Sequence, residues 1–406
     1  MTRHILISLA LVACGTGNID GGGDGSGSGS GSGSGMPPGG EVTMTVHDGQ
    51  APAAGVIVVF QSNEGALLGD TMTDATGVAT GKLPLGGMVS VVRPGVDGNP
   101  ADYFTYVGVK AGDKLSLVRP AITGANPTTV SVRVPTSPDG GQITVMTPCG
   151  TGTGDAPLVE VTLDGCGAMT DFYVVDGDGA QAASFLKRAA IAPEVDLSAE
   201  LFRANLTTTL TAANVLTDAT VTLEERLETD LFRPVFTTGT LDATAGTVDA
   251  NVADLPGVEQ LVVATVNYNN STQSLSSRGP YAATPSTLDV SIGLLSTVSE
   301  LAIASETITW AEDPNGAATD AVVIVLRTAT VTHTIAAPYA ASVKLPLLPT
   351  SYNAYNLAST DIPTIEHSMI KVTGGYDAVR ARIFNGELTD IAPMAGTSTV
   401  STTVSQ

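Results

Sequence analysis

Residues 42–60 read VTMTVHDGQAPAAGVIVVF, and this stretch decides the class of fold. At 42–46 valine and methionine alternate with threonine, which is the two-residue period of a strand with one buried face. Asp48 and Gly49 follow as a turn, and VIVVF at 56–60 is a continuous apolar run of strand length. The stretch therefore predicts two strands joined by a tight connection.

The same pattern continues along the chain, with short β-rich runs separated by Gly, Asp and Pro at spacings of about ten residues. Only 198–202 and 223–231 have a pattern that one or two helical turns could share. We therefore expect an all-β fold with little helix, built from tandem Ig-like or transthyretin-like β-sandwich domains. Further strands are expected at 88–92, 130–134, 143–147, 172–175, 206–210, 219–223, 248–252, 261–266, 308–310, 321–326, 331–335, 370–372 and 379–383.

Three motifs near the start of this pattern carry a family resemblance. The strand–turn–strand unit from Thr43 to Phe60 is followed by TDATGVA from Thr73 to Ala79 and by LPLGG from Leu83 to Gly87. This order resembles carboxypeptidase regulatory-like domains and related bacterial Ig-like domains. The resemblance implies a transthyretin-like β-sandwich with no catalytic residues of its own, in which Asp74 and Gly77 serve the turn between strands.

The length of the chain and its shifts in composition predict several domains, because 406 residues are long for a single core. The clearest break is the proline-flanked segment 120–127, and a second is expected between 196 and 206. The expected organisation is a lipoprotein signal peptide at 1–13, an anchor cysteine with a flexible Gly/Ser-rich linker at 14–40, a carboxypeptidase regulatory-like β-sandwich at 41–120, a disulfide-bonded β-sandwich at 121–200, and one or two further β-sandwich domains at 201–406.

The first residues have the pattern of a secretory leader. Arg3 precedes an apolar run at 5–11, which is far too short to span a bilayer as a helix, since spanning needs about 20 apolar residues. The sequence LVAC at 11–14 resembles the lipobox of bacterial lipoproteins. That resemblance implies cleavage before Cys14 and acylation, including palmitate, of this cysteine as the membrane anchor. The alternative is an ordinary signal peptide with a chance cysteine.

The linker behind the anchor has the composition of a flexible coil. Residues 15–40 are dominated by Gly and Ser, which gives a typical reach of roughly 25–30 Å. Gly15 stands where some enterobacterial lipoproteins have the Asp that retains them in the inner membrane. By that analogy we expect the bacterial outer membrane, with the folded body exposed at the cell surface. The expected partners are the membrane through the lipid anchor and a cell-surface protein or glycan.

The other two cysteines suit a disulfide. Cys149 and Cys166 are both flanked by glycine, and an oxidising compartment favours their pairing. A zinc site would need histidine or carboxylate ligands, and no histidine lies near either cysteine in the sequence. The C-x-x-C spacing of redox-active pairs is absent as well. We therefore expect a structural disulfide between Cys149 and Cys166.

The chain is strongly acidic, with a formal net charge of −22. Phosphate groups would repel it, so nucleic-acid binding is excluded as a main function. Solubility explains the charge most simply, and binding of divalent cations is the alternative. Asp176 and Asp178 resemble the opening of a calcium loop, but Lys187 stands where an EF-hand needs an acidic residue. They are weak metal candidates, and a hairpin turn is the favoured interpretation.

Motifs that indicate catalysis are missing from the sequence. HExxH, GxSxG and the phosphate-binding P-loop are absent, and His47, His333 and His367 are each expected at the surface or packed on a strand. Trp310 is expected to fill a sandwich core, with a sugar-stacking role as the minority interpretation. Abundant carboxylates leave a glycosidase-type pair open. We expect no catalytic residues and no cofactor.

These observations favour a non-catalytic, lipid-anchored cell-envelope protein with a structural, adhesive or partner-binding role. A surface module that binds glycan or Ca²⁺ is the first alternative. The second alternative is a hydrolase whose site is not visible in the sequence, or an accessory to an extracytoplasmic hydrolase.

Overall fold

The structure is a computed structural model, and all the residues it describes lie in one compact unit, Pro37–Gln406. For most strands between residues 206 and 278, and for those after residue 380, it describes the backbone only. The described residues are 40–49, 51–83, 87–95, 100–119, 127–137, 140–164, 166–177, 183–213, 219–227, 235–242, 247–253, 255, 258–268, 271–278, 288–289, 295–312, 316, 318–357, 361, 363–380, 383–385 and 398–405.

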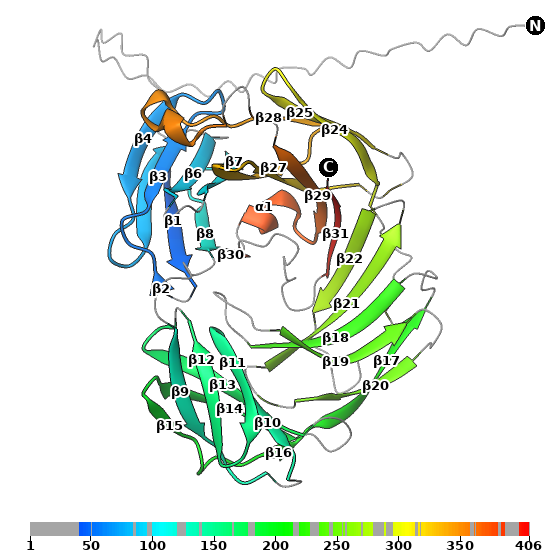
Figure 1. The fold of residues 1–406 in the computed structure, drawn as a ribbon. Coiled ribbons are helices and arrows are strands. Elements are labelled where there is room, and N and C mark those ends of the chain that lie inside the picture. The colour runs from blue at the N-terminus through cyan, green and yellow to red at the C-terminus, as the bar shows by residue number, and fades with distance from the viewer. Residues whose placement is uncertain are drawn as a thin grey trace, which may run out of the picture. The chain divides into compact units, whose positions relative to one another are not determined.

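Strands dominate this part of the chain, which confirms the expected all-β, sandwich-like class (Figure 1). The helical elements among the described residues are a 3₁₀ helix, η1 (Thr350–Tyr355), and a six-residue α-helix, α1 (Gly375–Arg380). Neither of these is of a length and hydropathy that would let it cross a bilayer.

The largest sheet has twelve strands and takes them from distant parts of the sequence. Neighbouring strands are antiparallel except at one position, where β7 pairs in parallel with β27. Its strands, in spatial order, are β19 (Val235–Asp242), β18 (Ala219–Leu227), β21 (Val258–Tyr268), β22 (Ser271–Arg278), β31 (Ser398–Ser405), β29 (Thr364–Val372), β26 (Ala321–Arg327), β27 (Val331–Pro338), β7 (Ala101–Val109), β6 (Gly87–Arg93), β3 (Ile57–Gln61) and β4 (Leu67–Met72).

The β7–β27 pairing bears on the domain organisation, because it joins the segment 41–120 to strands that follow residue 320. The core over this part of the sheet is likewise shared, since Phe104 and Val323 belong to one buried cluster. The sequence could not show this pairing, because strand periodicity contains no information about distant partners. The boundaries at residues 120 and 200 stay predictions.

A smaller sheet covers one face of the large sheet and completes a sandwich. The predicted alternation is observed, since Val42, Met44 and Val46 are fully buried while Thr43 and Thr45 are half-buried. The buried side chains pack with apolar residues of β3, β6, β7 and β26 in a continuous core. This smaller sheet contains β2 (Ala51–Pro52), β1 (Gly40–Asp48), β8 (Lys114–Arg119), β30 (Ile383–Asn385) and β5 (Val78–Leu83).

Asp74 and Gly77 form the turn that the sequence predicted. The Asp74 carboxylate accepts hydrogen bonds from the Thr76 amide at 2.8 Å, the Thr76 hydroxyl at 2.7 Å and the Val78 amide at 3.0 Å. These bonds, the hydroxyl bond first, lower the pKa of Asp74. Gly77 has φ of 76° and lies against the Val46 carbonyl, so this position needs glycine.

The opposite face of the large sheet is covered by a three-stranded sheet and the segment that follows it. Ile308, Val343 and Leu345 from the cover pack on Ile324 and Ile335 of the large sheet. Beyond this sheet, Tyr352 and Tyr355 of η1 pack beside the buried Tyr103. The covering strands are β24 (Val298–Ala304), β25 (Thr307–Glu312) and β28 (Ser342–Lys344).

Residues 128–204 form a second sandwich of two sheets, whose core cluster is drawn from Val130 to Leu197. Its edge strands β11 and β12 lie so close together that a Cβ atom on Gly152 would overlap the Glu160 carbonyl oxygen. One sheet contains β11 (Gly150–Asp155), β10 (Gln142–Thr147), β13 (Met169–Asp176), β14 (Ala183–Ala190) and β16 (Arg203–Ala204), and the other contains β12 (Leu158–Leu163), β9 (Thr128–Arg133) and β15 (Glu194–Asp196).

Two local predictions were wrong. Residues 379–383 were expected to be a strand, but Val379 and Arg380 end α1, where the Tyr376 hydroxyl contacts the carbonyl oxygens of Val107 at 2.6 Å and Ala336 at 2.8 Å. The helical alternative at 223–231 is wrong for its described part, which lies in β18. The remaining small sheet contains β20 (Thr247–Val252), β17 (Leu206–Ala213) and β23 (Leu288–Asp289).

Candidate functional site

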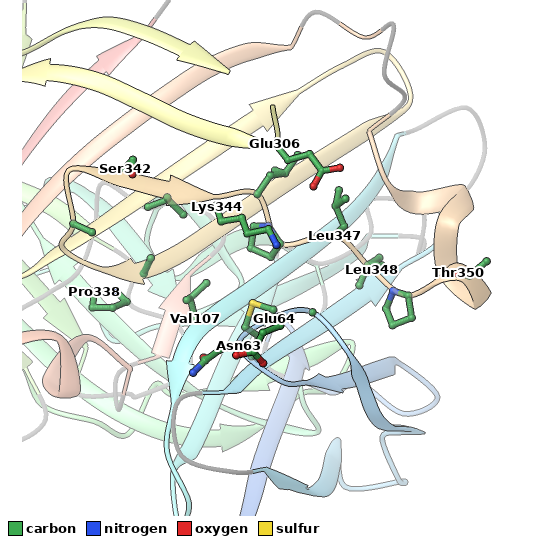
Figure 2. Close-up of a pocket in the computed structure, with 18 residues that line it drawn as sticks. Asn63, Glu64, Val107, Glu306, Pro338, Ser342, Lys344, Leu347, Leu348 and Thr350 are labelled. Atoms are coloured by element: carbon green, nitrogen blue, oxygen red, sulfur yellow. The ribbon is translucent and has the colours of Figure 1, made fainter. Parts of the chain in front are cut away.

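A cavity of about 410 Å³ lies between the covering layer and the ends of three strands of the large sheet (Figure 2). One wall is the β3–β4 loop, residues 63–65, and the other is β28 with the segment 345–350. Met88 of β6, Val107 of β7 and Ala337 of β27 lie between the walls. Segments far apart in the sequence therefore build one concave surface with apolar side chains at its centre, the usual character of a binding pocket.

The tight β24–β25 turn places a carboxylate at the rim of this pocket. Ser305 has φ of 50° and Glu306 has φ of 62°, so both central residues of the two-residue loop adopt the left-handed conformation of a type I′ turn. Glycine or asparagine is usual there, because other residues adopt this conformation at a cost of about 1 kcal/mol or more. The Glu306 carbonyl accepts the Leu345 amide at 2.7 Å, which fixes the start of the opposite wall.

Side-chain amides hold the two walls in place. Gln61 is fully buried, and its Nε2 donates to the carbonyl oxygens of Gly65 at 3.1 Å and Leu347 at 2.8 Å, one on each wall. The Asn356 side chain pairs with both backbone groups of Leu348, accepting its amide at 2.7 Å and donating to its carbonyl at 2.9 Å. The pocket is therefore preformed.

The charged residues of the lining are Glu64, Glu306 and Lys344. Within the described part of the chain none of the three forms an ion pair. In Figure 2 the Lys344 ammonium and the Glu306 carboxylate point in different directions. The lining thus offers two carboxylates and one ammonium for contact with a bound molecule, with a formal charge of 1 − 2 = −1 from these three residues.

The histidines lie away from this pocket. His333 is fully buried and stacks on Tyr103, with 3.6 Å between ring centroids, and its Nε2 lies 3.1 Å from the Thr105 hydroxyl. Burial lowers its pKa well below the ordinary value. His367 is fully buried against Trp310, and burial lowers its pKa to about 4. Strand packing, which was expected for these two histidines, is confirmed, and His47 is half-buried at the end of β1.

Trp310 was expected to fill a sandwich core, but it packs at the margin of one and keeps a polar contact. It is partly buried against the cluster under the covering sheet, and its Nε1 donates to Glu312 at 2.6 Å. Phe104 and Tyr106 are both buried in the first sandwich. None of these rings lines the pocket.

Of the two weak metal candidates, Asp176 lies among the described residues. Asp176 is buried, and its carboxylate accepts the Ser137 hydroxyl at 2.7 Å, while the Gly141 amide donates to the same hydroxyl at 2.9 Å. These bonds link the end of β13 to Ser137 and to Gly141, which lies just before β10. Asp178 and the lipidation candidate Cys14 lie outside the described residues. In the described part of the chain, no group of three or more His, Cys, Asp and Glu side chains could hold a metal ion.

The expected disulfide between Cys149 and Cys166 is confirmed, with 5.4 Å between the Cα atoms. It joins the turn before β11 to the connection between β12 and β13, next to the core of the second sandwich.

Replacing both cysteines with serine should lower the free energy of unfolding by about 3 kcal/mol, because the unfolded chain regains the freedom of the closed loop. Urea unfolding followed by circular dichroism measures this change. Wild-type protein under reducing conditions is the control and should show the same loss. Equal stability with and without the bond would contradict the prediction.

Comparison with known proteins gives no family for this chain. No family model matches it, and no curated protein matches it. Among solved structures it is similar to the "Structure of the Streptococcal ancillary pilin", at 10% identity and a TM-score of 0.15, over 62% of this chain and 98% of the other. A TM-score this low carries no argument about this protein.

The sequence did not predict the pocket. The one local signal was the run LPLLP at 345–349, whose two prolines do not fit a central strand.

Proposed function

We propose that this protein is a non-catalytic, lipid-anchored protein of the bacterial cell envelope whose folded body binds a partner at the cell surface. The LVAC sequence at 11–14 and the Gly/Ser-rich linker at 15–40 support the anchor and the distance from the membrane. The all-β body is consistent with a structural or adhesive role and supports the same proposal. We also propose that residues 41–120 are a carboxypeptidase regulatory-like domain.

The observation that carries the binding role is the preformed pocket beside β28. Its walls are held by buried Gln61 and by Asn356, so a partner would meet a surface that needs little rearrangement. Its apolar centre, with three charged residues at the walls, suits recognition of a partner surface. A glycan site would need rings for stacking, and the described residues of the lining include no aromatic side chain.

The anchor is tested with the full chain expressed in a bacterial host that processes lipoproteins. Labelled palmitate should enter the wild-type protein and the control Gly15→Ala, but not Cys14→Ser. Fractionation should retain the first two with the membrane and release Cys14→Ser. A mature protein with an unmodified Cys14 thiol would overturn the anchor.

The binding role is tested by site-specific photo-crosslinking on intact cells. A crosslinking amino acid at Thr350, which is exposed at the pocket, should capture a protein partner. The same amino acid at Thr80, exposed on β5 away from the pocket, is the control. Equal capture from both positions, or from neither, would contradict a binding role for this pocket.

A further inference from the structure

One edge of the covering sheet is open. β28 pairs with β25 alone among the described strands, in an antiparallel register that sets Val343 opposite Ile308. The Leu345 amide donates to the Glu306 carbonyl, so Glu306 and Leu345 are a hydrogen-bonded pair of this ladder. Val343 and Ile308, two residues along, are then the next hydrogen-bonded pair. Because such pairs alternate, the N–H and C=O groups of Ser342 and Lys344 point away from β25.

The pocket lies along this open edge. Its lining includes all three residues of β28 and none of β25, so the cavity is on the side of β28 that no described strand occupies (Figure 2). The outward backbone groups of Ser342 and Lys344 therefore face the pocket. Unpaired backbone groups of an edge strand are a ready template for another extended chain.

Several backbone groups in the rest of this wall are already occupied or absent. The Leu347 carbonyl accepts from Gln61, and both backbone groups of Leu348 are paired with Asn356. Pro346 and Pro349 have no N–H to offer. The outward N–H and C=O groups of β28 remain as a short run of main-chain groups available for pairing.

We propose that β28 binds an extended peptide segment of a partner protein, which adds to its open edge as a further strand. This inference rests on the proposed partner-binding function and names the kind of partner. Side chains of an added strand alternate between its two faces, so every second residue of the peptide would enter the apolar part of the pocket at Val107 and Leu347.

The charges of the site and the chain define the peptide further. Glu64 and Glu306 outnumber Lys344 in the lining, and the whole chain has a net charge of −22. A basic residue in the peptide would complement the carboxylates and be drawn to the acidic body. The expected segment is therefore extended, apolar at alternate positions, and contains Lys or Arg.

The test is a selection from a phage-displayed library of random heptapeptides on the purified mature body. We expect enriched peptides with apolar residues at alternate positions and at least one Lys or Arg. The variant Lys344→Pro removes the outward N–H without removing a bond to β25, and proline is tolerated at such edge positions. It should weaken binding of an enriched peptide at least about tenfold, while Lys344→Ala, which keeps the N–H, should change it less than about threefold in either direction.

A chemical control covers misfolding of the proline variant. The same peptide methylated at every central amide nitrogen should lose binding to the wild-type protein, since it can no longer form a ladder. The proposal is overturned if no peptide is enriched, if Lys344→Pro binds as well as wild type, or if the methylated peptide still binds. The crosslinker at Thr350 can also be placed in the Lys344→Pro variant. If it still captures a protein there, strand addition is refuted, but the proposed partner-binding function is not.

Discussion

Replacing Gly152 with valine should lower the free energy of unfolding by about 3 kcal/mol, because the second sandwich closes around a strip of glycines. A side chain at this position would overlap the Glu160 carbonyl oxygen, and backbone atoms cannot rotate away as the end of a flexible side chain can. The edges of the two sheets would have to separate beside the disulfide. Urea unfolding followed by circular dichroism measures the loss.

The chain offers a matched control two residues further along the same strand. A Cβ atom on Gly154 would meet nothing nearer than the Leu158 carbonyl oxygen at 3.8 Å. Gly154→Val should therefore change stability by less than about 1 kcal/mol, since valine suits a half-buried position in a strand. Equal losses for the two variants would show that the close approach at Gly152 does not limit the side chain there.

Acidification from pH 6.5 to pH 4 should destabilise the fold by about 3 kcal/mol through His367 alone. Burial against Trp310 lowers the folded-state pKa of His367 to about 4, whereas the unfolded chain has the ordinary value near 6.5. Between these two pH values the unfolded state binds a proton that the folded state does not. Stability is therefore full above pH 6.5, falls as the pH drops, and loses no more to this group below about pH 4.

The variant His367→Leu isolates this contribution. The ring nitrogens of His367 make no well-formed hydrogen bond within the described part of the chain, so leucine should pack there without leaving a polar partner unpaired. Chemical unfolding at a series of pH values should give a flatter profile for the variant than for wild type. Identical profiles would assign the acid sensitivity elsewhere, with His333 as the next candidate because its pKa is also lowered by burial.

Local features of the fold could be predicted where a few neighbouring residues determine them. The alternation at 42–46, the Asp74 turn and the disulfide partners each depend on short-range pattern or simple pairing, and each is observed. The helix α1 was missed because Val379 and Arg380 begin a run that alternates like a strand, while the contacts that fix the helix come from Tyr376 to distant carbonyls.

The candidate site could not be predicted, because no single segment contains it. Glu64, Met88, Glu306 and Lys344 meet only after the covering sheet is placed on the large sheet. In the sequence, Gln61 is an ordinary polar residue at the end of an apolar strand. In the structure it is fully buried and links both walls of the pocket. Periodicity shows which face of a strand is buried and gives no information about which loop will lie above it.

The parallel pairing of β7 with β27 has a consequence for the order in which the chain matures. Residues 101–106 align with residues 331–336, so this central contact cannot form until most of the polypeptide has been synthesised. Contacts so distant in sequence form slowly, and an apolar strand such as β7 stays without one neighbour in the interval. Premature termination before residue 331 would leave β7 without this neighbour and open to association with other chains.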